Sequence, residues 1–184
     1  MVKGKISKIL SEIGTVLDKV DDKEAELLVR EILGAKNIVA AGAGRAGMAA
    51  KAFIMRLGHM GLKAHMLGDT TLASMGAGDV LLVASGSGET QTVYDLVLIA
   101  KKNGARILLV TGNRESRMGK LADQIVLIQA PSKVKPVNNF TSIQPMTTLN
   151  EQSLMIFFDA LVLALMKEMG ETHETMWRRH SNLE

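Results

Sequence analysis

A run of glycines and hydroxyl residues in the middle of the chain has the composition of a phosphate-binding turn. It reads Ser85-Gly86-Ser87-Gly88-Glu89-Thr90, follows an apolar run over residues 80–84 and precedes helical periodicity to about residue 102. A helix N-terminus offers unpaired backbone N–H groups, glycines let a ligand approach the backbone, and hydroxyls donate to phosphate oxygens. The same residues also suit a plain helix cap in a tight turn. The Lys-Ser/Thr ending of a nucleotide P-loop is missing, which favours a small phosphorylated metabolite.

A second glycine-rich turn, Gly42-Ala43-Gly44-Arg45-Ala46-Gly47, follows the apolar run 37–41. Its glycines have the spacing of a dinucleotide fingerprint, but the acidic residue expected about 20 residues further on has no secure counterpart. We therefore do not predict a dinucleotide site. Arg45 is suited to bind a sugar oxygen or a phosphate, and it is equally suited to a surface salt bridge.

The elements around these turns alternate between strand and helix. Buried strands are predicted at 37–41, 63–67, 80–84, 105–110 and 124–128, and helices at 2–18, 23–33, 48–60 and after Thr90, with a short helix through Met118 and Leu121. We expect an α/β three-layer sandwich with a five-stranded parallel sheet, flavodoxin-like and doubly wound. The turns at 42–47, 85–90 and 111–113 then lie at the carboxyl ends of the strands, where ligands bind in such sheets.

The C-terminal third departs from this alternation. Residues 130–146 hold three prolines and no periodicity, which predicts a loop used for function or assembly. The following helix, about 149–169, is apolar on most of its circumference, so we expect it in a subunit interface of a homo-oligomer, a dimer or a tetramer.

Composition bounds the remaining possibilities. The 184 residues suit a single domain, with N-terminal helices in 1–35, the sheet core in 36–130 and C-terminal helices in 147–184. A net charge of +3 spread along the chain argues against nucleic acid as a partner. The absence of cysteine agrees with a cytoplasmic protein, and the apolar segment 153–166 is too short to span a bilayer. No His, Asp or Glu spacing fits a metal site, so no metal is expected.

Together these motifs resemble the sugar isomerase (SIS) domain family, and within it the 6-phospho-3-hexuloisomerases. The resemblance covers nearly the whole chain and rests on Gly44-Arg45-x-Gly47, Ser85 to Thr90, Gln144-Pro145-Met146, Glu151-Gln152 and the ending Arg179-His180-Ser181-Asn182-Leu183-Glu184. It implies interconversion of D-arabino-3-hexulose 6-phosphate and D-fructose 6-phosphate through an enediol, without a cofactor, in the ribulose monophosphate route of formaldehyde fixation. It also implies that the two glycine-rich turns, Gly44 to Gly47 and Ser85 to Thr90, bind the sugar phosphate.

The resemblance further implies the catalytic residues. It places the base at Glu151, although Thr148-x-x-Glu151 is also a capping-box pattern. It makes His180 a proton shuttle or ring-opening group that serves its own or a neighbouring subunit, although a histidine so near the C-terminus also suits a solvated tail. The family's first turn usually reads Gly-Arg-Ser-Gly, so Ala46 removes one hydroxyl. We expect this to weaken phosphate binding by roughly 1.5–3 kcal/mol.

Two other functions remain open on this reading. One is another phosphosugar isomerase of the same superfamily, acting for example on arabinose 5-phosphate. The other is a non-catalytic sugar-phosphate sensor, although the roughly 35 residues before the first strand are too few for a DNA-binding module. A sensor would also have no need of Glu151.

Overall fold

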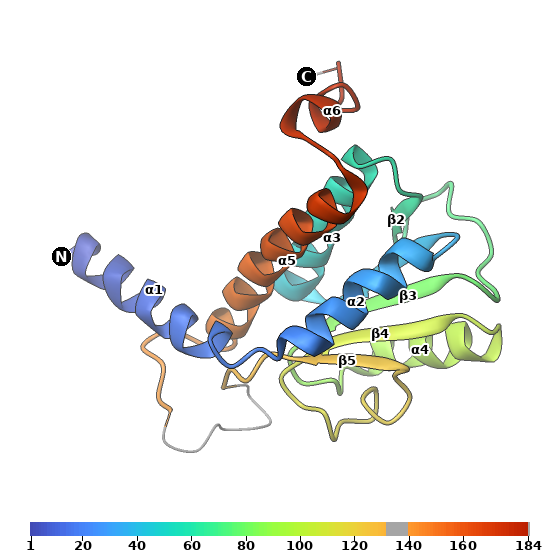
Figure 1. The fold of residues 1–184 in the computed structure, drawn as a ribbon. Helices are drawn as coiled ribbons and strands as arrows, with labels where there is room; N and C mark the ends of the chain where they lie inside the picture. The colour runs from blue at the N-terminus through green and yellow to red at the C-terminus, as the bar shows by residue number, and fades with distance from the viewer. Residues whose placement is uncertain (132–139, 184) are drawn as a thin grey trace.

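The computed structural model describes residues 1–131 and 140–183 of the chain, and its centre is a parallel sheet of five strands in the order β2-β1-β3-β4-β5 (Figure 1). The strands are β1 Ile38–Gly42, β2 Ala64–Met66, β3 Val80–Ser85, β4 Arg106–Thr111 and β5 Gln124–Leu127. The helices of the described residues are α1 Val2–Leu17, α2 Asp22–Gly34, α3 Gly44–His59, α4 Gln91–Lys102, α5 Thr148–Met169 and α6 His173–Trp177. The predicted fold class is confirmed.

The strand order creates a crevice at the carboxyl edge of the sheet. From β1 the chain moves outward to β2, whereas β3 returns to the other side of β1 and the later strands continue in that direction. Residues Gly42 and Ala84 are register partners at the ends of β1 and β3, and Ser85 is paired with Thr111 at the end of β4. Connections that leave neighbouring strands toward opposite faces open a ligand crevice there.

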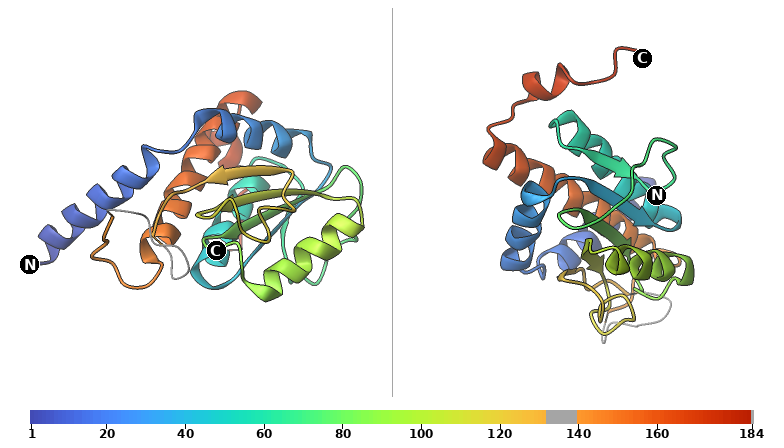
Figure 2. Two further views of the ribbon diagram at one scale, coloured as in Figure 1. Left: turned by 90° about the horizontal axis from the view of Figure 1, so that it is seen from below. Right: turned by 90° about the vertical axis from the view of Figure 1, so that its right-hand side faces the viewer.

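Helices cover the two faces of the sheet unequally. One face packs against α2, α3 and α5, with the end of α1, and the other packs against α4. The left view of Figure 2 shows α2 and α4 on opposite sides of the strands. The central strand β3 is buried along its whole length, as its unbroken apolar run predicts.

Three local expectations are wrong. Helix α3 begins at Gly44, four residues before the predicted start at residue 48, so the glycine-rich turn is the first turn of the helix itself. Residues 112–123 form successive turns in place of the short helix through Met118 and Leu121. These turns require glycine at position 119, because a Cβ there would lie 1.9 Å from the Arg114 carbonyl oxygen. Because residues 67–79, where no helix was expected, also connect two strands without one, the alternation of strand and helix is incomplete.

Helix α5 is the longest helix of the described chain and lies along α3. The rings of Phe53 and Phe158 stack between them with centroids 4.8 Å apart. Within the described residues, α5 alone is long and apolar enough to cross a membrane, and half of that stretch is buried inside the protein. Residues 153–166, which were expected to be too short to span a bilayer, thus belong to a longer helix that packs in the core.

Helix α1 is fastened to the chain that leads into α5. The carboxylate of Glu12 accepts hydrogen bonds from the Ser142 hydroxyl at 2.6 Å, the Ile143 backbone N–H at 2.8 Å and the Gln144 side-chain amide at 3.0 Å. These three residues belong to the predicted loop 130–146, of which 132–139 lie outside the described residues. Glu12 therefore fixes the last residues of this connection before the turn into α5.

Glycine is required where α3 leaves β1. A Cβ on Gly47 would lie 2.4 Å from the Gly42 carbonyl oxygen, whereas one on Gly58, in the same helix, would meet nothing within 4 Å. We expect Gly47→Ala to lower the free energy of unfolding by about 1–3 kcal/mol. Gly58→Ala should raise it by about 0.5–1 kcal/mol, because alanine favours the helix. Urea denaturation measures both, and equal effects at the two positions would contradict the close contact.

The Glu12 contacts predict a pH-dependent stability. Burial raises the pKa of Glu12, but its hydrogen bonds with Ser142, Gln144 and Ile143 outweigh this and hold the pKa below its ordinary value. Such a carboxylate stabilises the fold above the unfolded pKa, about 4.3, and the contribution is lost as the pH falls through the folded pKa. Because Glu12 is only partly buried and solvent screens its contacts, Glu12→Gln should cost no more than about 1 kcal/mol at pH 7. The difference should shrink in denaturation at about pH 3.5, and a constant penalty would exclude this role.

Candidate functional site

The predicted phosphate turn lies directly after β3 and is held together by its own hydroxyls. The Ser85 Oγ accepts a hydrogen bond from the Gly88 N–H at 3.1 Å, and the Ser87 Oγ accepts one from the Glu89 N–H at 3.2 Å. A hydroxyl that accepts in this way keeps its own proton to donate. Thr90 is the N-cap residue of α4 but makes no side-chain capping bond. The turn thus orients Ser85 and Ser87 as donors, and the simple capping interpretation fails for Thr90.

Neighbouring turns pack against the glycines of this segment. Gly88 has a φ of +66°, and a Cβ on it would lie 2.0 Å from the Ser116 Oγ. The Gly112 N–H donates to the Gly86 carbonyl at 3.0 Å, which joins the turns after β3 and β4. Gly86 and Gly88 therefore lie where the turn after β3 meets the chain that follows β4. These contacts fix the shape of the turn.

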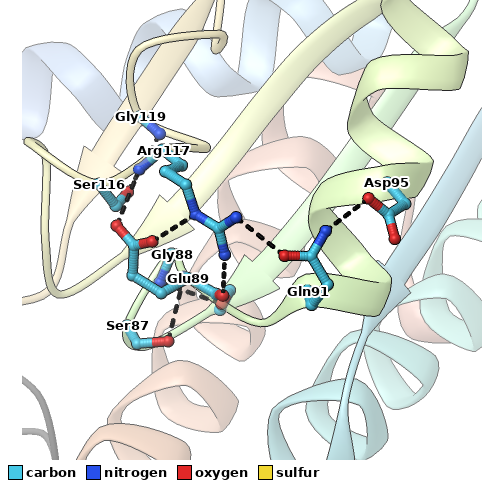
Figure 3. Close-up of polar contacts among 9 residues, drawn as sticks. Ser87, Gly88, Glu89, Gln91, Asp95, Ser116, Arg117 and Gly119 are labelled. Carbon is cyan, nitrogen blue, oxygen red and sulfur yellow. Dashed lines mark hydrogen bonds and ion pairs between the residues drawn. The ribbon is translucent and has the colours of Figure 1, made fainter.

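Arg117 fastens the connection between β4 and β5 to the same turn (Figure 3). Its backbone N–H and its Nε donate to the Glu89 carboxylate at 2.9 and 2.7 Å, and its guanidinium also donates to the Glu89 carbonyl and to Gln91. These hydrogen bonds from Arg117 lower the pKa of Glu89. Sequence reasoning left Glu89 between a sugar contact and a favourable charge at the helix start, and it missed Arg117. No local signal marks Arg117, because the pair spans 28 positions.

The turn after β1 lies beside the turn after β3. The glycine spacing that resembles a dinucleotide fingerprint has a packing cause, because Gly42 and Gly47 come too close for a Cβ on either. The N-cap residue Ala43 has no capping side chain, so the first N–H groups of α3 face the crevice without a partner from their own helix. The Ala46 methyl packs against the core cluster of this face.

Glu151, the predicted base, projects from the first turns of α5 toward the turn after β1. Its Oε2 lies 3.2 Å from the Arg45 Nε, and its Oε1 accepts a hydrogen bond from the Thr147 hydroxyl at 2.7 Å. The Glu151 side chain is 17% exposed and that of Arg45 is 55% exposed. The N-cap of α5 is Thr147, so no capping box forms between Thr148 and Glu151. Both contacts instead orient the carboxylate at the crevice, and Arg45 makes the salt bridge while keeping a solvent-facing surface.

Asn150 is a residue of this site that sequence reasoning missed. Its side chain is 1% exposed, and a Cβ on Gly86 would lie 2.5 Å from its Oδ1. Its Nδ2 is buried without a hydrogen-bond partner. Buried polar groups are nearly always paired, so an orphaned donor beside a phosphate-type turn indicates a group kept for a ligand or for movement of the turn.

His180 does not join Glu151 in one chain. Its ring lies beyond the C-terminal end of α3, with centroids 5.1 Å from the His59 ring and 5.0 Å from the Trp177 ring. Arg179 ties this tail to α3 by donating to the His59 carbonyl at 3.0 Å. Arg45 and His59 stand at opposite ends of α3, roughly 21 Å apart at the helical rise. Glu151, Arg45 and the Ser85 to Thr90 turn are therefore brought together, and His180 is not.

The arrangement combines an anion cradle with a fixed carboxylate. Two helix N-termini, of α3 and α4, and three hydroxyl residues meet at the strand crevice, and a guanidinium-held carboxylate overhangs them. A phosphate can bind at the turns while the carboxylate abstracts or donates a proton a few bonds away.

A family model agrees with this geometry. Residues 31–163 match the model of the SIS domain, which is most of the chain. The chain belongs to the SIS domain family.

Individual relatives show which members of the SIS domain family this chain is similar to. The chain is 38% identical over 179 residues to a 3-hexulose-6-phosphate isomerase of Bacillus subtilis (strain 168), with 97% of both chains covered. It is also 38% identical over 183 residues to a 3-hexulose-6-phosphate isomerase of Mycobacterium gastri, covering all of this chain and 92% of that one. A crystal structure from Methanococcus jannaschii, for which a function of 3-hexulose-6-phosphate isomerase has been inferred, superposes with a TM-score of 0.85 at 26% identity, covering 98% and 99% of the two chains.

The orphaned amide of Asn150 predicts a substitution that separates stability from binding. In Asn150→Leu a side chain of similar shape removes the unpaired Nδ2, so the free energy of unfolding should stay equal or rise by about 1 kcal/mol. Thermal stabilisation by fructose 6-phosphate should fall at the same time. Asn103→Leu, at the exposed end of α4, is the control and should leave binding unchanged. A loss of more than about 2 kcal/mol in Asn150→Leu would mean that the Asn150 amide is structural.

Proposed function

We propose that this chain is an isomerase that interconverts D-arabino-3-hexulose 6-phosphate and D-fructose 6-phosphate. The observation that carries the proposal is the position of Glu151, fixed by Arg45 and Thr147 next to the turn that follows β3. A phosphate cradle alone would serve any sugar-phosphate binder. The carboxylate beside it supplies the base that an isomerase needs, and relatives of 35–38% identity over nearly their full length carry this activity in their names.

The chemistry moves a carbonyl between adjacent carbons. Starting from 3-hexulose 6-phosphate, the Glu151 carboxylate takes the proton from C2, which leaves an enediol between C2 and C3. The same group returns the proton to C3, while a second proton leaves the oxygen on C2 and arrives at the oxygen on C3. One base of suitable position can serve both carbon steps. Arg45 holds that base, and its solvent-facing guanidinium is available to stabilise an oxygen that becomes negatively charged.

The two glycine-rich turns hold the substrate in this proposal. Ser85, Ser87 and Thr90 donate their hydroxyl protons to the phosphate, Gly86, Gly88 and Glu89 complete the turn that presents them, and residues Gly44 to Gly47 line the other side of the crevice. Ala46 contributes its backbone N–H where the family pattern would add a hydroxyl. This assignment gives the phosphate enough donors without a side-chain cation.

We further propose that His180 moves the proton between the oxygens in the site of a neighbouring subunit. Its distance from Glu151 in one chain supports this, because a twofold or higher assembly can bring the end of one chain to the crevice of another. The proposed state is a cytoplasmic homo-oligomer, a dimer or a tetramer, in which residues 1–184 form a single domain. Its proposed place is the ribulose monophosphate route of formaldehyde fixation.

A coupled assay of both directions tests the activity. Fructose 6-phosphate and arabinose 5-phosphate are offered side by side, with and without a chelator. Turnover of the hexulose pair alone supports the proposal, and turnover of arabinose 5-phosphate alone assigns a different phosphosugar isomerase. No turnover, combined with thermal stabilisation by a sugar phosphate, would make the chain a sensor.

The assignment of the base predicts the effect of one substitution. Glu151→Gln keeps the size of the side chain and its contact to Thr147 but removes the proton acceptor, so kcat should fall by at least about 100-fold with little change in KM. Asp159→Asn, on the exposed side of the same helix, is the matched control and should keep full activity. Unchanged turnover in Glu151→Gln would remove Glu151 as the base.

A further inference from the structure

The first turns of helix α1 project from the body of the chain as a nearly bare arm, defined as residues 2–10 (Figure 1). Val2, Ile6 and Leu10 are 68%, 50% and 58% exposed, and their spacing of four residues puts them on one stripe. Ile9 is partly buried against the core, and full burial begins in the second half of α1 with Ile13 and Val16. A short amphipathic helix is stabilised mainly by the packing of its apolar face, and here that face is exposed to water. We therefore expect another surface to cover it.

A groove of matching character lies between α2 and α5. It encloses about 700 Å³ and is lined mainly by aliphatic side chains and Phe157. It begins at Leu17 and Val20, where α1 ends, and follows α2 to Leu33 and α5 to Ala164. The arm measures roughly 13 Å, and the stretch of α2 from Asp22 to Leu33 roughly 16 Å, at the helical rise. One arm therefore fits the length of one groove.

The charges on the two surfaces are complementary. The arm carries Lys3, Lys5 and Lys8 and has no acidic residue before Glu12. The rim of the groove carries the carboxylates of Asp22, Glu26 and Glu168 against the single guanidinium of Arg30. Arg30 is itself engaged with Glu26 at 3.8 Å. A basic amphipathic helix and an acid-rimmed apolar groove favour each other and disfavour like-charged partners.

A chain cannot fill its own groove with this arm, because α1 runs outward from the point where the groove begins. We propose that the arm of each chain lies in the α2–α5 groove of a second copy, in a twofold exchange in which each copy gives one arm and receives one. This rests on the proposed homo-oligomer and names its contact surfaces. In such an isologous contact the same two surfaces meet twice.

The exchange also links assembly to the site. The residue that follows the arm on the next turn of α1 is Glu12, which holds Ser142, Ile143 and Gln144 ahead of Glu151. Seating the arm on a partner therefore steadies the helix that positions the lead-in to the candidate base. Helix α1 thus links assembly, through the arm, to the positioning of the candidate site, through Glu12.

Sedimentation of an arm variant tests the contact. Ile6→Asp combined with Leu10→Asp should raise the dissociation constant of the assembly at least about 100-fold, and a tetramer built on two kinds of contact should fall to a dimer. Ile99→Asp removes an exposed apolar side chain from α4 on the other face of the sheet and should leave the assembly intact. Circular dichroism checks that the arm variant remains folded.

Disulfide trapping tests where the arm lies. The chain has no cysteine, so single substitutions give an unambiguous readout. A chain with Ile6→Cys is mixed with chains carrying Leu33→Cys, Ala160→Cys or Ala164→Cys in the groove, and with Ile99→Cys as the control. We expect cross-linked pairs with at least one groove position and none with the control.

The outcomes separate this inference from the proposed oligomer. A monomeric wild-type chain overturns both. An oligomer that survives the arm variant overturns the arm exchange alone, and so does an assembly that dissociates in the arm variant but forms no cross-link with any groove position. The proposed activity fails by a different result, the absence of turnover by the wild-type chain in the coupled assay.

Discussion

The contact between Asn150 and Gly86 is the one on which the rest of the site depends. Gly86 belongs to the turn after β3, and Asn150 belongs to a helix that begins more than sixty positions later. Because no Cβ separates them, the N-terminus of α5 can sit directly over the crevice between β1 and β3. Glu151 follows Asn150 in the chain and so arrives beside Arg45. A larger residue at Gly86 would displace both the amide and the base.

The turn after β3 keeps its hydroxyls available to a ligand. The backbone N–H groups of Gly88 and Glu89 donate to the hydroxyl oxygens of Ser85 and Ser87, which fixes each oxygen and leaves each hydroxyl proton able to donate elsewhere. Arg117 reaches this turn from the connection between β4 and β5, and its guanidinium is already bound to Glu89 and lies over the face of Tyr94, 4.5 Å from the ring centroid. Arg117 therefore braces the turn, and the proposed function assigns the phosphate to hydroxyls and helix N-termini.

Sequence patterns predicted what depends on neighbours in the chain. The buried strand 80–84 and its Ser-Gly turn follow from local composition, and the alternation of strands and helices predicts a parallel sheet with two turns at one edge. Arg117 and Asn150 escaped because each acts on a residue far away in the sequence, and nothing near either one marks that partner. The start of α3 was misplaced because Gly44 and Gly47 argue locally against a helix. The close contact between Gly42 and Gly47 requires the one glycine, and the φ of +57° at Gly44 favours the other. Glu151 needed the family resemblance, because the sequence pattern alone favours a cap that the structure does not form.

Energetically unfavourable features lie close to the candidate base in the sequence. Among the described residues, the buried side-chain atoms without a partner are the Gln144 Oε1, the Asn150 Nδ2 and the Gln152 Oε1, all within eight positions of one another. Met146, in the same stretch, is the one described non-glycine residue with a positive φ, at 57°. Each such feature costs of order 1–3 kcal/mol and persists only where its surroundings hold it. Stability alone would not gather them in one segment. The candidate base Glu151 belongs to the same segment, which therefore has the character of a chain shaped for its ligand at the expense of its own packing.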